Sequence, residues 1–530
     1  MADSSKKQTF LHGAALLALA TAVVKLIGAF YKIPLKMVIG DQGYGYFSTA
    51  YEIYAVLLMI STAGLPVAMS RMISEASSLG HYKQVRKIYT VSRTIFLTLG
   101  LVGALLMTLF CKQLAAFQEQ PDAWAAIGTL GPCCFLICLM STYRGFFQGQ
   151  SNMKPTSVSQ VIEALCKLVV GLSAAVLIGI YLKSTTFVAA GAIFGVTMSC
   201  LVSSFYLNRC FRKAFKDMPV SAEETTAGKD IAKGLLAIAI PITIGSAGLQ
   251  MLYVLETKIY MSQLLEFMTQ QDADTQKGIY NFTQKIFNMP CAFITPITIS
   301  VIPAITAQLT RGEHKAVRAT EESAARVTAL ISAPCAVGIA VLAQPVTGLL
   351  GGYTGEKLAL ATQLMAVLGI CIVFNATVLL TNAIMQAHGH VNLPVINMFV
   401  GGIVKLLAIA VLTGNPHIGI LGTPIGSLLC YICITVLNLI TIRRVIPEAP
   451  AIAKNLLKAI VAAAVMGVFV WGAWFGLGKI GISSRVILCG LPIAVGVAVY
   501  AVAAVKLRAI TREDCLLLPK GEKIAKLLHL

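Results

Sequence analysis

Apolar segments of about 20 residues recur along the whole 530-residue chain, and each is long enough to cross a bilayer as a helix. Examples are GLVGALLMTLFCKQL and VAAAVMGVFVWGAWFGLG. No long polar segment interrupts the series. Only 12% of the residues are charged, whereas soluble proteins carry about 25%. The sequence therefore predicts an all-α polytopic membrane protein.

Hydropathy divides the chain into about fourteen predicted membrane helices. Basic residues concentrate in every second connecting segment, as the positive-inside rule describes. We therefore expect a multi-pass cell-membrane protein with cytoplasmic N- and C-termini, and we attribute the net charge of +19 to this topology rather than to nucleic-acid binding. The predicted spans are 10–38, 44–70, 89–113, 124–147, 155–182, 186–208, 233–261, 279–307, 325–350, 357–386, 392–413, 418–441, 456–478 and 484–507.

The sequence repeats itself weakly. GHYKQVRK (80–87) follows the second span, and GEHKAVRA (312–319) follows the eighth. Three further pairs share one constant offset: Gly131 and Gly369, Gln148 and Gln386, Lys167 and Lys405. Because these matches keep the same order along the chain, they predict two copies of one six-helix lobe.

Six helices return the chain to the side of the membrane from which it started, so both lobes should have the same orientation. They should be related by a pseudo-two-fold axis along the membrane normal, with a substrate site between them and alternating access by rocking. The predicted organisation is an N-lobe (1–215), a cytoplasmic linker (216–232), a C-lobe (233–445), two additional helices (446–510) and a basic cytoplasmic tail (511–530).

Charged residues inside the predicted spans are candidates for function, because a charge at the bilayer centre costs a few kcal/mol. Lysines outnumber acidic residues there, which favours an anionic cargo, since lysine binds phosphate as a point charge. Two alternatives stay open: Lys32 and Lys258 could extend to the outer interface, and Glu163 and Lys167 have the i, i+4 spacing of a helix ion pair. The intramembrane charges are Lys25, Lys32, Glu52, Glu163, Lys167, Glu256, Lys258, Lys285 and Lys405.

No catalytic or metal-binding pattern is present in the sequence. The seven histidines are scattered, there is no P-loop, and the cysteines lie singly within spans as small core residues. We expect no cofactor and no bound metal, and energy from an Na⁺ or H⁺ gradient or from the membrane potential.

Four stretches resemble the multidrug/oligosaccharidyl-lipid/polysaccharide exporter superfamily, in the branch that contains stage V sporulation protein B and the MurJ-type lipid II flippases. They are KLIGAFYKIPLKMVIG (25–40), GLPVAMSRMISE (64–75), YRGFFQGQSNMKPTSVSQVIEALCK (143–167) and GIYNFTQKIFNMPCAFITPITISVIPAI (278–305). The resemblance implies a fourteen-helix, V-shaped fold with a cationic cavity. It also implies that the chain translocates an undecaprenyl-diphosphate-linked sugar, such as a peptidoglycan precursor, in cell-wall synthesis or sporulation.

The resemblance also suggests roles for the intramembrane charges. Lys25 and Lys32 stand where such proteins commonly have arginine, and Lys285 matches a cationic position; with Lys258 they are expected to bind the diphosphate. Expected partners are the lipid-linked sugar, membrane lipids and the cell-wall synthesis machinery. No role follows for Glu163, Lys167 or Lys405. The expected polar or coupling residues of the cavity are Glu52, Glu256, Asn281 and Gln284.

Two other functions fit the sequence less well. A cation-coupled drug antiporter of the same superfamily would need acidic residues in a lobe pocket, whereas this chain has mainly lysines within its spans. A membrane enzyme acting on lipid-linked sugars would need paired acidic residues or histidines in a large outer loop. The longest predicted outer loop (262–278) contains Glu266, Asp272 and Asp274 but is short and lacks histidine. We therefore expect a transporter and not an enzyme.

Overall fold

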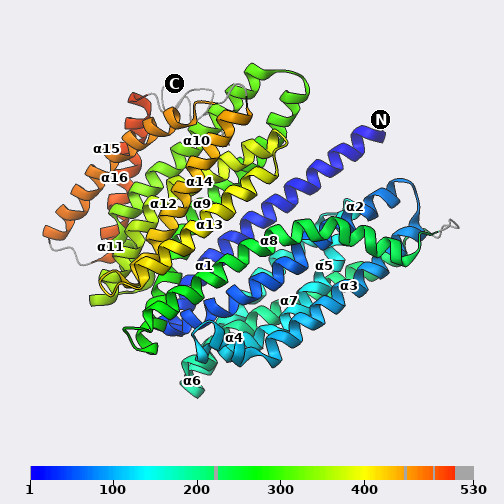
Figure 1. The fold of residues 1–530 in the computed structure, drawn as a ribbon, viewed down its shortest axis with the longest axis horizontal. Coiled ribbons are helices and arrows are strands. Elements are labelled where there is room, and N and C mark those ends of the chain that lie inside the picture. Colours follow the sequence, from blue (N-terminus) through cyan, green and yellow to red (C-terminus); the bar gives the residue numbers. More distant parts are fainter. Residues whose placement is uncertain (1, 220–224, 447–449, 481–483, 508–530) are drawn as a thin grey trace. The chain divides into compact units, whose positions relative to one another are not determined.

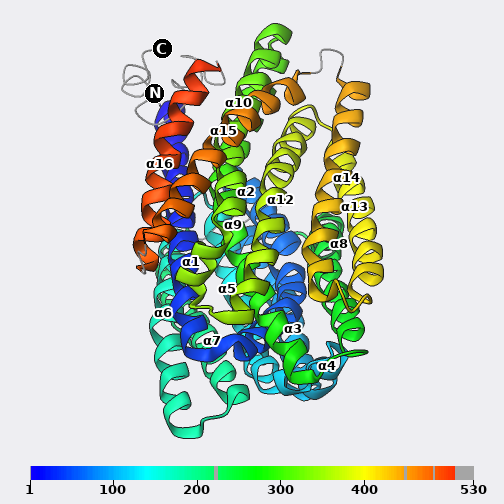
Figure 2. The same ribbon diagram turned by 90° about the vertical axis from the view of Figure 1, so that its left-hand side faces the viewer.

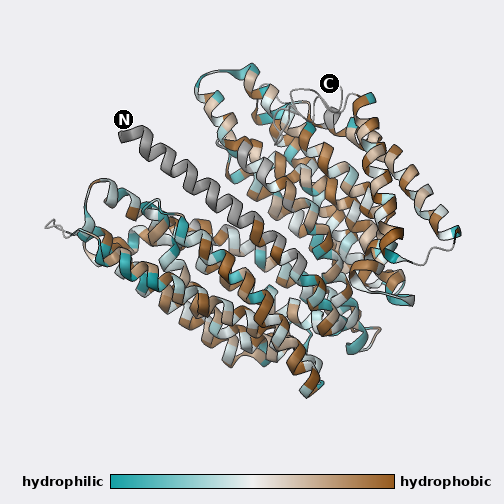
Figure 3. Cartoon of the chain, turned by 180° about the vertical axis from the view of Figure 1, so that it is seen from behind, coloured by the Kyte–Doolittle hydropathy of each residue, from teal (hydrophilic) through white to brown (hydrophobic). Residues whose placement is uncertain are grey.

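The computed structural model is built from α-helices, and the part of the chain that it describes contains no strand. It describes the backbone of residues 2–219, 225–446, 450–480 and 484–507. The prediction of an all-α membrane protein is confirmed, and Figure 3 shows hydrophobic residues along the helices and hydrophilic residues near many turns. Within that backbone, side chains are described from residue 23 onward, except at 25, 26, 29, 30, 241, 245, 249, 292, 296, 297, 299, 300 and 453–455.

The chain divides into two compact units, unit 1 (Met1–Gly278) and unit 2 (Ile279–Leu530), and the boundary falls within helix α9 (Figures 1 and 2). Unit 1 contains α1 (Ala2–Met59), η1 (Ile60–Gly64), α2 (Leu65–Ser78), α3 (Tyr82–Leu109), α4 (Cys111–Phe117), η2 (Pro121–Ala123), α5 (Trp124–Gly149), α6 (Lys154–Leu182), α7 (Thr185–Lys216), α8 (Gly228–Leu264) and the start of α9 (Gln270–Thr310). Unit 2 contains the rest of α9, α10 (His314–Val341), α11 (Ala343–Gly351), α12 (Gly355–Ala387), α13 (Asn392–Thr413), η3 (Gly419–Leu421), α14 (Gly422–Val445), α15 (Ile452–Lys479) and α16 (Arg485–Lys506).

Helix α8 packs within unit 1 because a glycine lets two backbones meet. A Cβ added to Gly64 would lie 2.2 Å from the carbonyl oxygen of Ala239 on α8, so no larger residue fits there. Gly64 ends the π-helical segment η1, which lies between α1 and α2.

The predicted lobes, 1–215 and 233–445, are defined by sequence repetition rather than by compactness, and their boundaries stay a prediction.

Helix α1 covers the first predicted span, 10–38, and most of the second, 44–70, which continues through η1 into α2. The two spans are separated by a kink at Gly40, a non-helical residue with φ 71° and ψ −178°. Glycine adopts this left-handed backbone without steric cost, whereas other residues are strained there. Lys36, near the end of the first predicted span, lies within α1; it is 7% exposed, and its Nζ lies 3.1 Å from Asp41 Oδ1.

Twelve helices in the described part of the chain are long and apolar enough to cross a membrane. The segment Tyr31–Ser78 counts once among them, although its 48 residues correspond to about 72 Å of helix at 1.5 Å per residue, more than a single crossing requires. Helix α9 is described only in part and is not among the twelve. The expected number of fourteen spans therefore stays a prediction.

Corresponding turns in the two units have the same geometry. Gly80 and Gly312 both have positive φ, and each N–H bonds to the carbonyl oxygen three residues earlier, at 3.1 and 3.0 Å. After the next pair of matching helices, Ser151 and Gly389 repeat this arrangement at 2.9 and 3.0 Å. These turns follow the order of the sequence repeat, as a duplicated chain would.

Candidate functional site

A cavity of about 280 Å³ lies within unit 1, between α1, α5 and α6; we call it the unit 1 cavity. Gly28 leaves space on the α1 side, since a Cβ added there would meet no described atom within 4 Å beyond its own helix backbone and chain neighbours. Polar side chains from α5 and α6 form the opposite side. The lining residues are Val24, Ile27, Gly28, Tyr31, Arg144, Gln160, Glu163, Ala164 and Lys167.

Glu163 forms its ion pair across two helices. Its Oε2 lies 2.9 Å from Arg144 Nη2 on α5, and Arg144 Nε donates a 3.1 Å hydrogen bond to Ser159. Both charged side chains are partly buried. The pairing of Glu163 with Lys167 that the i, i+4 spacing suggests is therefore corrected: the guanidinium on the neighbouring helix offers a planar fork of donors, which suits a carboxylate better than a lysine does.

Lys167 is held by aromatic side chains. Its Nζ donates a hydrogen bond to Tyr51 Oη and lies 4.5 Å and 5.8 Å from the ring centroids of Tyr51 and Tyr31. Among the described residues, no carboxylate forms an ion pair with Lys167. Tyrosine rings attract a cation but do not neutralise it, so the lining of the unit 1 cavity carries one excess positive charge.

Two further polar atoms on this lining lack partners. In the described part of the chain, neither Tyr31 Oη nor Gln160 Oε1 has a hydrogen-bond partner. Tyr31 is only 2% exposed, and buried polar groups are usually paired because leaving them unpaired costs about 1–3 kcal/mol. Both atoms are closed off from water, and Tyr31 Oη packs beside Gly171 of α6, so they lie behind the surface of the cavity.

A second group of buried charges surrounds Lys277, whose side chain is completely buried in unit 1. Its Nζ donates a hydrogen bond to Thr49 Oγ1 and lies 3.7 Å from Glu52 Oε2. The sequence placed Lys277 in an outer loop, and this placement is wrong. The loop is short, because α8 ends at Leu264 and α9 begins at Gln270.

Asp274 lies one turn before Lys277 and is also buried. Its Oδ1 accepts hydrogen bonds from Gln120 Nε2 at 2.7 Å and Gln270 Nε2 at 2.9 Å, and its Oδ2 accepts one from Tyr46 Oη at 3.0 Å. These bonds join α1, the turn after α4 and the start of α9. Asp274 is therefore a structural residue within unit 1 and does not belong to an exposed loop.

Of the other predicted site residues of unit 1, Glu52 and Glu256 belong to the group around Lys277, whereas the rest lie elsewhere. Lys258 forms an ion pair with Glu119, so its ammonium does not extend alone to an interface. Glu52 accepts a 2.7 Å hydrogen bond from Thr257, and Glu256 is buried. Lys32 is half-buried. The side chain of Lys25 lies outside the described residues.

The predicted residues of unit 2 line no described cavity together. Asn281 is buried, and its Nδ2 has no hydrogen-bond partner in the described part of the chain. Gln284 Nε2 donates a 3.4 Å hydrogen bond to Tyr280 Oη. Lys285 and Lys405 are half-buried.

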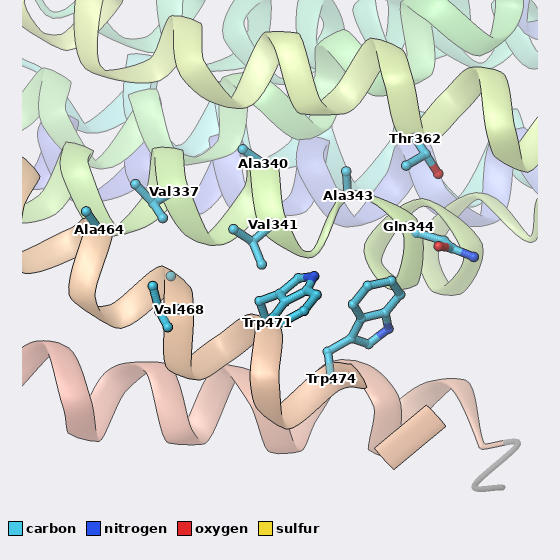
Figure 4. A pocket seen from close by; sticks show the side chains of 11 residues that line it. Val337, Ala340, Val341, Ala343, Gln344, Thr362, Ala464, Val468, Trp471 and Trp474 are labelled. Atoms are coloured by element: carbon cyan, nitrogen blue, oxygen red, sulfur yellow. The ribbon is translucent and has the colours of Figure 1, made fainter. Parts of the chain in front are cut away.

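Unit 2 has an apolar groove of about 780 Å³ between α10, α11, α12 and α15; we call it the α15 groove. Figure 4 shows Trp471 and Trp474 extending from α15 toward Val341 and Gln344. Tryptophan combines a large apolar ring with one polar N–H. The lining residues are Val337, Ala340, Val341, Ala343, Gln344, Thr362, Ala464, Gly467, Val468, Trp471 and Trp474.

Comparison with known proteins identifies the family. The polysaccharide biosynthesis protein family matches residues 10–309, more than half of the chain, and a second polysaccharide biosynthesis family matches residues 260–359. The chain belongs to the polysaccharide biosynthesis protein family. Stage V sporulation protein B of Bacillus subtilis (strain 168), a relative, is 26% identical over 520 residues, which cover 97% of this chain and 98% of that protein.

One further relative and two solved structures support placing this family member in the multidrug/oligosaccharidyl-lipid/polysaccharide exporter superfamily. Lipid II flippase MurJ of B. subtilis (strain 168) is 24% identical over 75% of this chain and 76% of its own length. A structure of lipid II flippase MurJ in an inward closed conformation is similar with a TM-score of 0.66 and 13% identity, covering 93% of this chain and 99% of that one. An inward-facing multidrug resistance MATE transporter has a TM-score of 0.67 and 14% identity, covering 82% of this chain and 99% of that one.

These matches confirm the family resemblance predicted from the sequence, and they confirm that this family member is a transport protein rather than an enzyme. They also confirm a multi-pass membrane protein. The structure adds one cavity residue that sequence reasoning missed. Arg144 lies close to the end of a predicted span, where a basic residue is usually attributed to the interface, and only the packing of α5 on α6 brings it to Glu163.

Proposed function

We propose that this protein is a flippase that moves an undecaprenyl-diphosphate-linked oligosaccharide, such as lipid II, across the cytoplasmic membrane by alternating access. Such a cargo combines an anionic diphosphate with a long apolar chain. The similarity to stage V sporulation protein B and to lipid II flippase MurJ supports this cargo class.

The charge of the unit 1 cavity carries this proposal. Among the residues that line it, the one carboxylate, Glu163, is paired with Arg144, and the ammonium of Lys167 is left without an acidic partner. An excess cation in a membrane cavity is costly unless an anion compensates it. The cavity therefore suits a phosphate group.

The same observation disfavours the alternative of a cation-coupled drug antiporter. Such a pump would bind its cationic drug and its coupling ion at an accessible carboxylate, whereas the carboxylate of this cavity, Glu163, forms an ion pair with Arg144.

The α15 groove adds support for a lipid, since its apolar lining matches an isoprenoid chain better than it matches a small polar drug.

The proposal includes an orientation and an energy source. The basic loops face the cytoplasm, with both termini inside, and an Na⁺ or H⁺ gradient or the membrane potential drives transport. Lys25, Lys32 and Lys285 are proposed as further contacts for the diphosphate, and the cell-wall synthesis machinery as the system that the flippase serves. Reporter fusions after successive helices test the orientation.

A flipping assay tests the function. The purified protein is reconstituted into liposomes that contain fluorescent lipid II in one leaflet, with and without an imposed ion gradient. We expect transfer of lipid II and no gradient-driven uptake of a cationic dye. Dye uptake without lipid transfer would instead establish the antiporter.

A further inference from the structure

We infer that the unit 1 cavity is an anion site in which one phosphate of a prenyl diphosphate binds Lys167 and displaces Glu163 from Arg144. The inference rests on the proposed function and assigns the phosphate to residues that the sequence left without a role. Glu163 is then a resident anion, which holds Arg144 in place while the cavity is empty.

Geometry supports this exchange. Glu163 and Lys167 are one turn apart on α6, so a group that contacts Lys167 from the cavity also approaches the carboxylate of Glu163. Arg144 reaches Glu163 from α5 through Nη2, while its Nε is held by Ser159 at 3.1 Å. The guanidinium is therefore fixed in position and can exchange one oxyanion for another.

The size of the cavity also fits. A volume of about 280 Å³ corresponds to about nine water molecules at about 30 Å³ each. This is enough for one phosphate group and a few waters.

A neutral polar side chain on the lining adds to the site. The hydroxyl of Tyr31 does not contribute, because it is buried beside Gly171. Gln160 extends from α6 into the same lining, so its amide can donate to a phosphate oxygen. Together with the two cations, this amide matches a phosphate, which accepts several hydrogen bonds at once.

Binding of a soluble prenyl diphosphate tests the inference. Farnesyl diphosphate is titrated into the purified full-length protein at low salt, and affinity is measured by calorimetry. Farnesol and inorganic pyrophosphate are titrated in parallel, to distinguish a lipid headgroup from a free phosphate and from the apolar chain alone. We expect the wild type to bind farnesyl diphosphate more tightly than either control.

The variants should change the affinity in opposite directions. Lys167→Met should weaken farnesyl diphosphate binding by about 10- to 100-fold, as expected for loss of a charge-assisted hydrogen bond, and Lys167→Arg should retain most of it. Glu163→Gln should strengthen binding by about 3- to 10-fold, because the resident negative charge is removed. The matched control is Lys405→Met, at the corresponding position in unit 2, which should change the affinity by less than about 2-fold.

A purely structural ion pair would give a different pattern. Weaker binding in a folded Glu163→Gln variant, or equal losses in Lys167→Met and Lys405→Met, would overturn the inference. Each variant is checked for folding by size-exclusion chromatography. If Glu163→Gln misfolds, Glu163→Asp replaces it. Glu163→Asp should strengthen binding by a smaller factor, because the shorter side chain holds Arg144 less well. If the variants change the affinity for farnesyl diphosphate as expected but the protein flips no lipid II, the anion site is supported and the proposed function is rejected.

Discussion

The two units use different chemistry at corresponding positions. At the offset that relates Lys167 to Lys405, Arg144 corresponds to Asn382, and Glu163 corresponds to Gly401. Unit 1 therefore has an ion pair between α5 and α6, whereas unit 2 has neither charge at the matching place.

Neutral amides take over this position in unit 2. Asn438 Nδ2 donates hydrogen bonds to Asn382 Oδ1 at 2.9 Å and to Thr381 Oγ1 at 2.8 Å, while Asn397 Nδ2 donates to Asn438 Oδ1 at 2.8 Å. Asn438 is completely buried. The network satisfies its own polar groups without a charged residue, although unit 2 keeps a lysine, Lys405, at the position that matches Lys167.

Packing differs as well. A Cβ added to Gly401 would lie 2.3 Å from Ile434 Cγ1, so the space that Glu163 uses in unit 1 is filled by α14 in unit 2. One copy of the duplicated fold thus has an ion pair beside a cavity, whereas the other has a packed amide network that lacks this ion pair. Under the proposed function, the first copy would recognise the anionic cargo and the second would have a supporting role.

The largest effect on stability is expected from a substitution of Lys277, since the stability of unit 1 depends on its buried charges. Lys277→Met removes the cation beside Glu52 and Asp274 and leaves buried carboxylates uncompensated. We expect the free energy of unfolding to fall by about 3–5 kcal/mol. Thermal unfolding in detergent measures the change. The double variant Lys277→Met/Glu52→Gln should recover part of the loss, and an unchanged melting temperature in the single variant would show that these charges are not needed.

A smaller effect is expected from a single methyl group in unit 2. Gly401→Ala places a Cβ against Ile434, and overpacking of this kind costs about 1–3 kcal/mol. Its matched control is Gly28→Ala in the unit 1 cavity, where open space should make the substitution neutral or slightly stabilising. Equal melting temperatures for the two variants would contradict the contrast between a packed core and a cavity.

The smallest effect on stability is expected from removing an exposed ion pair. Glu313 Oε1 lies 2.8 Å from Arg311 Nε on the surface of unit 2, where water and salt screen the charges. Glu313→Gln should leave the melting temperature unchanged within error. A decrease similar to that of Lys277→Met would mean that burial does not decide the importance of charges in this protein.

Much of the fold could be predicted from the sequence. Apolar segments longer than a bilayer crossing have few alternatives to helices, and the repeat correctly paired the turns at Gly80 and Gly312. Intramembrane Glu163 and Lys167 were also identified, because charges in apolar segments stand out.

The ion-pair partners of the charged residues and the burial of polar residues were harder to predict. Spacing along one helix suggested that Glu163 pairs with Lys167, but a residue on another helix decides the pairing. Hydropathy assigned Lys277 to a loop, because the surrounding segment QQDADTQKG is polar. Asp274 and Lys277 of this segment are buried, with contacts to α1, α8 and the turn after α4. Such contacts join residues far apart in the sequence, so a local pattern does not reveal them.

Flipping rates of two matched lysine variants test the central claim most directly. Lys167→Met and Lys405→Met are compared with the wild type in liposomes that contain fluorescent lipid II, at equal amounts of folded protein. The account predicts a decrease of about 10- to 100-fold for Lys167→Met and less than about 2-fold for Lys405→Met. The account would be contradicted if Lys167→Met flipped lipid II at the wild-type rate, or if both variants lost the same fraction of the flipping rate.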